Sequence, residues 1–279
     1  MAFSFVFPTI VSLPLGYDAT VIAPIGQIAQ RLVSKDAEVV VRANLCADGE
    51  VTALPDARYR FEDGKLAGDD PDPWVFRDRL EEGAKNPGYL EIEAVSADES
   101  KIFSSKRVFG LYTCFGKDGK ASFFSDNAYK YGAPPVINQM ARFRRYVDTY
   151  PVINIDRTRD MGESLALLNP YQKPIVAQIR TSDGRKLKKT RIAAQSALNI
   201  NLSDLLQDGE DKWAGQVQLT ANNRLITFTF KHRFDDQAWI TDYEHLDPFR
   251  DDPTHLPFAQ KLRQDIGEVL VAWRGGRTR

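Results

Sequence analysis

The acidic and histidine side chains late in the chain are the residues best suited to acid–base or metal chemistry. The run TDYEHLDP contains Asp242 and His245, and the corresponding run SDN earlier in the chain supplies Asp126. A carboxylate and an imidazole can serve as general base and general acid, or as ligands of a metal ion. If the late run is a strand, Asp242 and His245 point to opposite faces, because side chains alternate. We therefore predict no metal site, and Asp126, Asp242 and His245 are catalytic candidates only if the chain is an enzyme.

The common motifs of nucleophilic, zinc and nucleotide chemistry do not occur. The sequence contains no GxSxG, HExxH, GxGxxG or GxxxxGK[ST] run. Cys46 and Cys114 have no neighbouring histidine and are expected to be buried, and a bridge between them stays open. We expect no cofactor, and an enzyme of this kind would act on a lipid-like or sugar substrate in a cavity between domains.

An arginine-rich stretch near the middle of the chain is a second candidate site. MARFRRYVDTY interleaves Arg142, Arg144 and Arg145 with aromatic residues such as Tyr146, and Arg157 follows. Guanidinium groups bind carboxylates and phosphates through paired hydrogen bonds, and ligand clefts favour domain boundaries. The stretch predicts a site for a small anionic ligand or a partner protein. The alternative is an exposed strand whose arginines pair with nearby acids.

Aromatic side chains suggest a third kind of site. Exposed Trp or Tyr rings can form a flat platform for a sugar, and Trp74, Tyr129 and Tyr131 are candidates for it. Most of the 16 Phe residues alternate within predicted strands, so we expect them in the core. A carbohydrate-binding module is therefore an alternative function.

Charge and length limit the class of protein. The 279 residues include 37 basic and 38 acidic side chains, for a net charge of -1, which argues against nucleic acid as a partner. No apolar run reaches the roughly 18 residues that a membrane-spanning helix needs. The apolar N-terminal stretch begins without a basic residue and contains Pro8 and Pro14, so it is a poor signal peptide. We expect a cytoplasmic protein of two domains.

The elements that must position these residues follow the pattern of strands. In LLNPYQKPIVAQIRTSDGR, apolar and polar side chains alternate from Ile175 to Ile179, and Asp183-Gly184 then marks a turn. A second alternating segment covers 198–202, and WAGQVQLTANNRLITFTFKHRF resembles a hairpin centred on Asn222. Four short strands without a helix between them predict an antiparallel β-sandwich.

The first half of the chain repeats this plan. The matched segments are 37–51 with 174–187, 88–115 with 215–234 (hairpin for hairpin), and 123–135 with 239–249. A charged stretch, 62–87, has no counterpart and is predicted to be an inserted loop. We predict an all-β chain with these parts: a first β-sandwich at 1–140, a linker at 141–162, a second β-sandwich at 163–252, and a C-terminal amphipathic helix with a basic tail at 253–279.

Turns and strands of the second half follow a recurring order. They are Glu163-Ser164, Asn169-Pro170, Asp183-Gly184, Ala194-Gln195-Ser196 and the strand from Ile200 to Leu205. In this layout the second half resembles bacterial sandwich domains of the sensory rhodopsin transducer type. The resemblance implies a compact module used for oligomeric binding and signal relay, without catalytic residues to carry over.

The preferred function at this point is a non-enzymatic binding or adaptor protein. It would recognise a partner protein or a small anionic ligand, with the linker and the stretch 62–87 as its recognition surface. Self-association through a sheet edge or through the C-terminal helix is also expected.

Overall fold

The computed structural model describes most of the chain. The described residues are 9–27, 35–69, 72–80, 86–96, 108–115, 120–130, 146–187, 189–222, 225–235, 239–245, 249–250 and 266. Within them the chain is mostly β-strand, and the paired strands run antiparallel. The predicted all-β, antiparallel class is confirmed.

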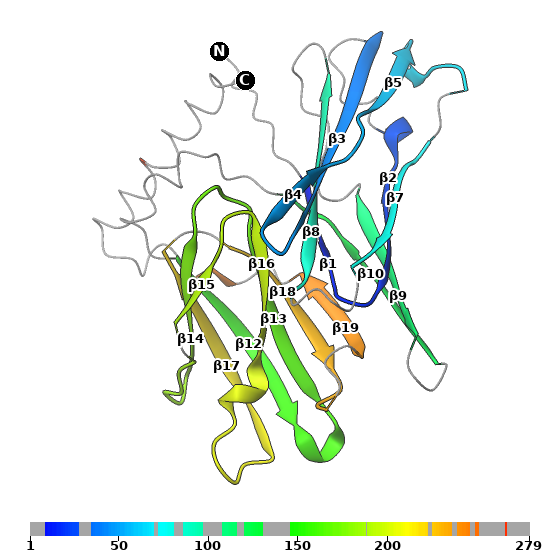
Figure 1. The fold of residues 1–279 in the computed structure, drawn as a ribbon. Helices are drawn as coiled ribbons and strands as arrows, with labels where there is room; N and C mark the ends of the chain where they lie inside the picture. The colour runs from blue at the N-terminus through cyan, green and yellow to red at the C-terminus, as the bar shows by residue number, and fades with distance from the viewer. Residues whose placement is uncertain are drawn as a thin grey trace.

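Two sheets form from the first half of the chain (Figure 1). Sheet A has the order β11-β1-β8-β3-β5-β6, with β4 beside β3, and sheet B has the order β10-β9-β2-β7. The strands of sheet A are β1 (Thr9–Leu13), β3 (Ala37–Ala47), β4 (Glu50–Ala53), β5 (Ala57–Glu62), β6 (Lys65–Leu66), β8 (Gly88–Ser96) and β11 (Tyr129–Lys130). The strands of sheet B are β2 (Asp18–Ala23), β7 (Trp74–Arg79), β9 (Phe109–Phe115) and β10 (Ala121–Asn127).

Two further sheets form from the second half. Sheet C has the order β15-β14-β17-β12-β20, and sheet D has the order β16-β13-β18-β19. The strands of sheet C are β12 (Tyr146–Asp156), β14 (Ile175–Thr181), β15 (Thr190–Ile192), β17 (Lys212–Ala221) and β20 (Phe249–Arg250). The strands of sheet D are β13 (Gly162–Asn169), β16 (Ser196–Asn201), β18 (Ile226–His232) and β19 (Ile240–His245), and the second half also contains the 3-10 helices η4 (Arg157–Arg159) and η5 (Leu202–Leu205).

The two pairs of sheets share one strand order. Read from the opposite end, sheet C is β20-β12-β17-β14-β15 and sheet D is β19-β18-β13-β16. Sheet C then matches sheet A strand for strand, and sheet D matches sheet B. The matching strands also follow the same order along the chain, and only β4 and β6 of the first half have no counterpart. The match extends to the predicted Asp-Gly turns, because Gly49 and Gly184 follow β3 and β14 with φ values of 85° and 92°.

Alternation of side chains explains why these segments become strands with one buried face. In β14 the residues Ile175, Ala177 and Ile179 are buried, and the residues between them reach water. Strand β13 is an exception, because all eight of its residues are buried. Leu165 and Leu167 pack into a core with sheet C, whereas Ala166 and Leu168 pack into the core that contains the first half. Sheet D is therefore covered on both faces.

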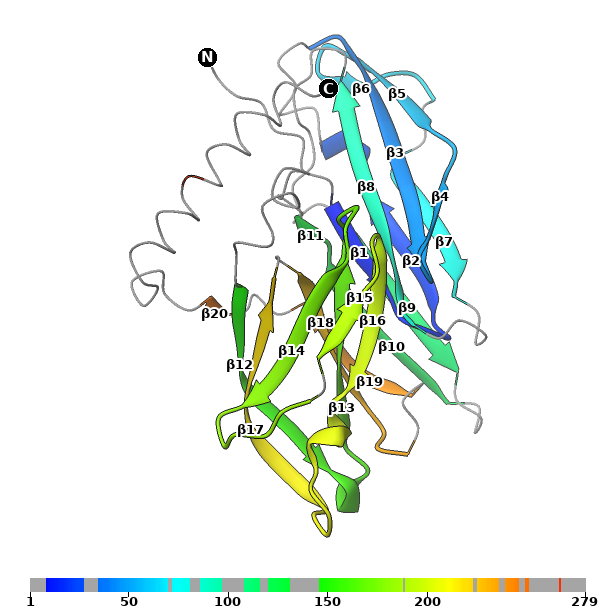
Figure 2. The same ribbon diagram turned by 60° about the vertical axis from the view of Figure 1, so that its left-hand side comes forward.

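An aromatic cluster joins the halves where sheet D meets the first half. Tyr243 of β19 stacks on Phe228 and Phe230 within sheet D, and on Phe124 of β10 in sheet B. The Tyr17 hydroxyl donates to the carbonyl of Ile240 at 2.8 Å and accepts from its amide at 2.7 Å. Figures 1 and 2 show β10 and β19 side by side at this contact. The rings and hydrogen bonds make the two halves one packed unit here.

The predicted hairpins at 88–115 and 215–234 are wrong. Strand β8 belongs to sheet A and β9 to sheet B, and likewise β17 belongs to sheet C and β18 to sheet D. The chain passes from one sheet to another at both places. Asn222 shows the reason in the second half, because its backbone and side chain bond to Val176 of β14 rather than to β18. A turn signal marks where a strand ends, but it does not specify the next partner.

The stretch 62–87 is not simply a loop, because it contains β6 and β7. Strand β7 pairs with β2 at the edge of sheet B and occupies the place that β16 occupies in sheet D. Phe76 points into the core, whereas Val75, Arg77 and Arg79 are exposed. The sequence of β7 did not show the alternation of apolar and polar residues that marks a strand, because this edge strand carries several charged residues. Similarly, β12 begins within the expected linker, so sheet C includes residues 146–156.

Two other expectations concern the cysteines and the C-terminal segment. Cys46 and Cys114 are buried free thiols, and burial raises the pKa of Cys46 to about 11. The predicted helix and basic tail at 253–279 lie outside the described residues, apart from Ile266.

Candidate functional site

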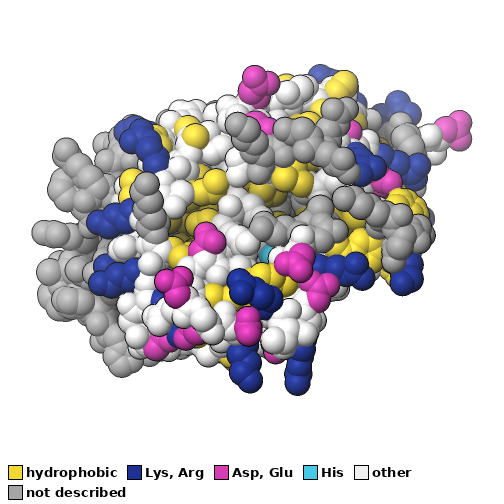
Figure 3. Space-filling view, turned by 60° about the horizontal axis from the view of Figure 1, so that its bottom comes forward, with side chains coloured by type: hydrophobic (Ala, Val, Ile, Leu, Met, Phe, Trp, Pro, Cys, Tyr) yellow, Lys and Arg dark blue, Asp and Glu magenta, His cyan; other side chains and the backbone are white. Residues whose placement is uncertain are grey.

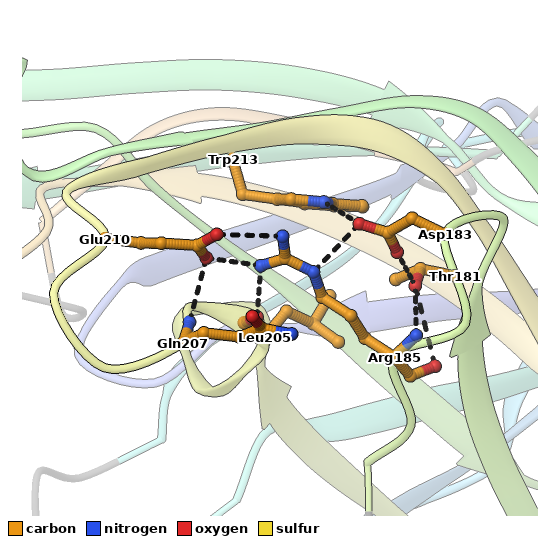
Figure 4. A network of polar contacts seen from close by, with 7 residues as sticks. All are labelled: Thr181, Asp183, Arg185, Leu205, Gln207, Glu210 and Trp213. Carbon is orange, nitrogen blue, oxygen red and sulfur yellow. Dashed lines mark hydrogen bonds and ion pairs between the residues drawn. The ribbon is translucent and has the colours of Figure 1, made fainter.

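A network of polar contacts surrounds Arg185, in the turn after β14 (Figure 4). Its guanidinium forms two hydrogen bonds with the Glu210 carboxylate, at 2.5 and 3.0 Å, and donates to the carbonyl of Leu205 at 2.9 Å. Nε donates to Asp183 at 2.9 Å, and the guanidinium carbon lies 5.6 Å from the ring centroid of Trp213. The Arg185 side chain is only 14% exposed. The hydrogen-bond donors of its guanidinium group are thus used by the carboxylates of Asp183 and Glu210 in the same chain.

Asp183 is the second centre of this network. It accepts hydrogen bonds from Thr181 Oγ1 and from the indole nitrogen of Trp213. The pKa of Asp183 is lowered to about 2, first by the Thr181 hydroxyl and then by Trp213 and Arg185. The contacts connect the turn after β14, the segment after η5 and the first residues of β17. The network is arranged to hold three segments together rather than to bind an external anion.

Removing Arg185 is expected to weaken this junction. In Arg185→Ala, the carboxylates of Asp183 and Glu210 and the carbonyl of Leu205 lose the hydrogen bonds that Arg185 donates, so the melting temperature should fall by several degrees. Arg185→Lys should recover only part of the loss, because an ammonium group cannot reproduce the planar fork. Thermal unfolding followed by circular dichroism measures both variants. A melting temperature of Arg185→Lys equal to that of wild type would contradict a role for the planar guanidinium group.

A serine–histidine pair lies inside sheet D. Ser164 Oγ lies 2.7 Å from His232 Nε2, and His232 Nδ1 lies 2.8 Å from the carbonyl oxygen of Arg233. A carbonyl can only accept, so Nδ1 carries the proton and Ser164 donates to Nε2. This is the geometry that activates a serine nucleophile. Both residues are buried, however, at 0% and 2% exposure, and Gly162 lies directly against the imidazole ring. The pair satisfies two buried polar groups, and no substrate can reach it in this state.

Asp126, Asp242 and His245, the catalytic candidates if the chain is an enzyme, do not form a cluster in the part of the chain that the structure describes. Asp126 accepts from the amide of Asn127 and lies on the same side of β10 as Phe124. Asp242 forms an ion pair with Lys231 at 2.9 Å and points away from the face of β19 that carries Tyr243. Since Tyr243 packs toward Phe124, Asp126 and Asp242 lie on opposite sides of β19. The side chain of His245 lies outside the described part.

The other candidate residues are only partly described. Arg142, Arg144 and Arg145 lie outside the described residues, and Tyr146 begins β12 without a described side chain. Arg157 lies in η4, 3.6 Å from a carboxylate oxygen of Asp211, with its guanidinium carbon 4.9 Å from the ring centroid of Phe234. Its charge is thus shared with an acid of the same chain.

Trp74, the candidate for a sugar platform, is half-buried in β7. It packs against the core of the first half and pairs with Ala23 across the sheet. Of the other two platform candidates, Tyr129 lies in β11 without a described side chain, and Tyr131 lies outside the described residues. The described atoms therefore provide no flat aromatic platform around Trp74.

The outer face of sheet B is the surface that sequence reasoning missed. Four large apolar side chains are exposed on it: Phe123 at 77%, Phe115 at 64%, Leu111 at 41% and Val75 at 40%. Phe123 lies on β10, and Phe115 and Leu111 lie on its neighbour β9, whereas Val75 lies on β7, on the other side of β2. All four side chains point away from the face that carries Tyr112 and Phe76. We call this surface the sheet B face. Exposed apolar side chains on adjacent strands are typical of a contact surface.

Charged residues do not form a comparable patch on the face of the molecule seen in Figure 3. Lys and Arg side chains are interspersed there with Asp and Glu, and hydrophobic side chains are exposed between them. Among the described residues, no three His, Cys, Asp or Glu side chains are grouped so as to hold a metal ion. None of the described helical segments is long and apolar enough to cross a membrane.

Comparison with known proteins adds no family. No protein-family model matches the chain, and no curated protein matches it. The function is therefore inferred from the geometry of the chain itself. Of its described features, the sheet B face is the surface most suited to an external partner, because the polar clusters are satisfied internally.

Proposed function

We propose that the chain is a non-enzymatic binding protein made of two tandem β-sandwich domains, with the sheet B face as its recognition surface for a partner protein. The first sandwich would consist of sheets A and B, and the second of sheets C and D. Their common strand order and the core between sheets C and D support a duplication. The layout of the second half, similar to sandwich domains of the sensory rhodopsin transducer type, is in keeping with a binding module.

The exposure of Phe123 is the observation that carries this proposal. A phenylalanine that is 77% exposed, beside Phe115 and Leu111 on the neighbouring strand, leaves apolar area in contact with water. Binding a partner removes that area from water, and aromatic side chains commonly dominate such contacts. Exposed side chains spread over the face of a sheet suit a protein better than a small molecule, which needs a concave pocket.

Affinity capture tests the proposal. A tagged wild-type chain should enrich a specific protein from a lysate of the source organism, and Phe123→Asp should lose it, because the substitution places a charge at the centre of the contact. Val176→Asp is the matched control, since Val176 is 40% exposed on β14 of sheet C. Equal capture by Phe123→Asp and wild type would contradict the assignment of the sheet B face.

A further inference from the structure

We infer that the partner of the sheet B face is a second copy of this chain, packed face to face about a two-fold axis. The inference depends on the proposed function, in which the sheet B face is a binding surface. It goes further by identifying what that surface binds. The strand order of the two halves supplies the first reason.

The face of sheet D that corresponds to the sheet B face is already a contact surface within the chain. Strands β9 and β10 correspond to β18 and β19, because each pair occupies the same place in the same strand order. On sheet D the outward residues of this pair include Phe228, Phe230 and Tyr243, which are buried against the first half. On sheet B the outward residues Leu111, Phe115 and Phe123 are apolar as well, but they are exposed. The chain thus carries two versions of one apolar contact face, and among the described residues only the version on sheet D is covered.

Among the described residues of the second half, no surface corresponds to the one that receives sheet D. In the first half, Tyr112 and Phe124 form a stacked cross-strand pair that contacts Tyr243. In the second half, one inward cross-strand pair of β18 and β19 is Lys231 with Asp242, an ion pair whose side chains are about half exposed. A head-to-tail contact would have to desolvate these charges against an apolar sheet, which is costly. An open chain of copies is therefore disfavoured.

A two-fold arrangement instead matches the sheet B face with itself. An axis over β9 and β10 places the strip of Leu111, Phe115 and Phe123 in each copy against the same strip in the other. Arg77 and Arg79 of β7 then remain at the rim, where they stay in water. Apolar residues in the centre with charged residues around them are the usual composition of a protein interface. Closed two-fold dimers are also the commonest symmetric assemblies.

Solution mass of the full chain tests the dimer. Light scattering coupled to size exclusion, over micromolar and higher concentrations, should give twice the chain mass for wild type and for Val176→Asp. Phe123→Asp should raise the dimer Kd by at least about tenfold, because it buries a charge twice in the symmetric contact. Phe115→Asp should act in the same way, and circular dichroism confirms that each variant is folded.

Three results would overturn the dimer. They are a wild-type chain that stays monomeric at the highest concentration, folded variants that dimerise as tightly as wild type, and masses that grow beyond two copies. Affinity capture separates this failure from failure of the proposed function. If wild type is monomeric but captures another protein that Phe123→Asp loses, only the dimer is overturned. If it captures neither a copy of itself nor another protein, both are overturned.

Discussion

Replacing Tyr243 by alanine is expected to lower the free energy of unfolding by about 3–5 kcal/mol, the usual cost of deleting a buried aromatic ring. Tyr243 is 4% exposed. Its ring centroid lies 5.0 Å from that of Phe230 and 5.1 Å from that of Phe124, so it contacts both halves of the chain. The deletion leaves a cavity at the junction that joins sheet D to the first half. Urea unfolding followed by tyrosine and tryptophan fluorescence measures the loss.

Tyr243→Phe is the matched control, because it keeps the ring and removes only the hydroxyl. That hydroxyl donates to the carbonyl of Ser12 at 3.2 Å, and Tyr112 donates to the same carbonyl at 2.9 Å. The acceptor stays satisfied in the variant, so the expected cost is about 1 kcal/mol. Similar losses for Tyr243→Phe and Tyr243→Ala would mean that the hydrogen bond, and not the ring packing, stabilises the junction.

The strands were predictable where alternation and turn chemistry agree. Ile175, Ala177 and Ile179 alternate within a short run, and Asp183-Gly184 follows it, so β14 and its turn could be predicted from local residues alone. Strand pairing was harder to predict. Asn222 ends β17 by bonding to Val176, a contact between residues 46 positions apart that no local pattern reveals. The predicted hairpins failed for this reason.

The polar network around Arg185 and the sheet B face were also hard to predict, because they depend on residues that are distant in sequence. Arg185 lies in a recognisable turn, but its partners Glu210 and Trp213 follow many residues later. Phe123 and Phe124 are adjacent in sequence, and only the fold decides that Phe124 joins the aromatic cluster while Phe123 is exposed. When both faces of a strand carry apolar residues, alternation cannot tell the core side from the contact side.

The buried carboxyl of Glu163 should make the stability of the protein depend on pH near neutrality. Glu163 lies in β13 at 3% exposure, and its Oε2 accepts a hydrogen bond from the amide of Asn154 at 3.1 Å. Desolvation raises the pKa of Glu163 from 4.5 to about 7. The Asn154 amide and the charge of Lys231 act in the opposite direction, and Asp242 adds to the rise.

The direction of the pH effect follows from the raised pKa. The folded state favours the protonated carboxyl, so its contribution to stability is complete below pH 4.5 and is lost as pH rises through about 7. Above that pH, folding must bury a carboxylate. Glu163→Gln keeps an acceptor for Asn154 and carries no charge at any pH. The variant should match wild type near pH 4.5 and exceed its free energy of unfolding by up to about 3 kcal/mol at pH 8.

Urea unfolding at a series of pH values between 4.5 and 8 measures this difference. Lys231→Met provides the opposite test, because removing the cation that lowers the pKa of Glu163 should steepen the loss of stability with rising pH. If the stability of Glu163→Gln follows that of wild type in parallel over the whole range, Glu163 ionises without cost in the folded state. Water would then have to reach its carboxylate through the end of sheet D, and desolvation would not be what governs its charge.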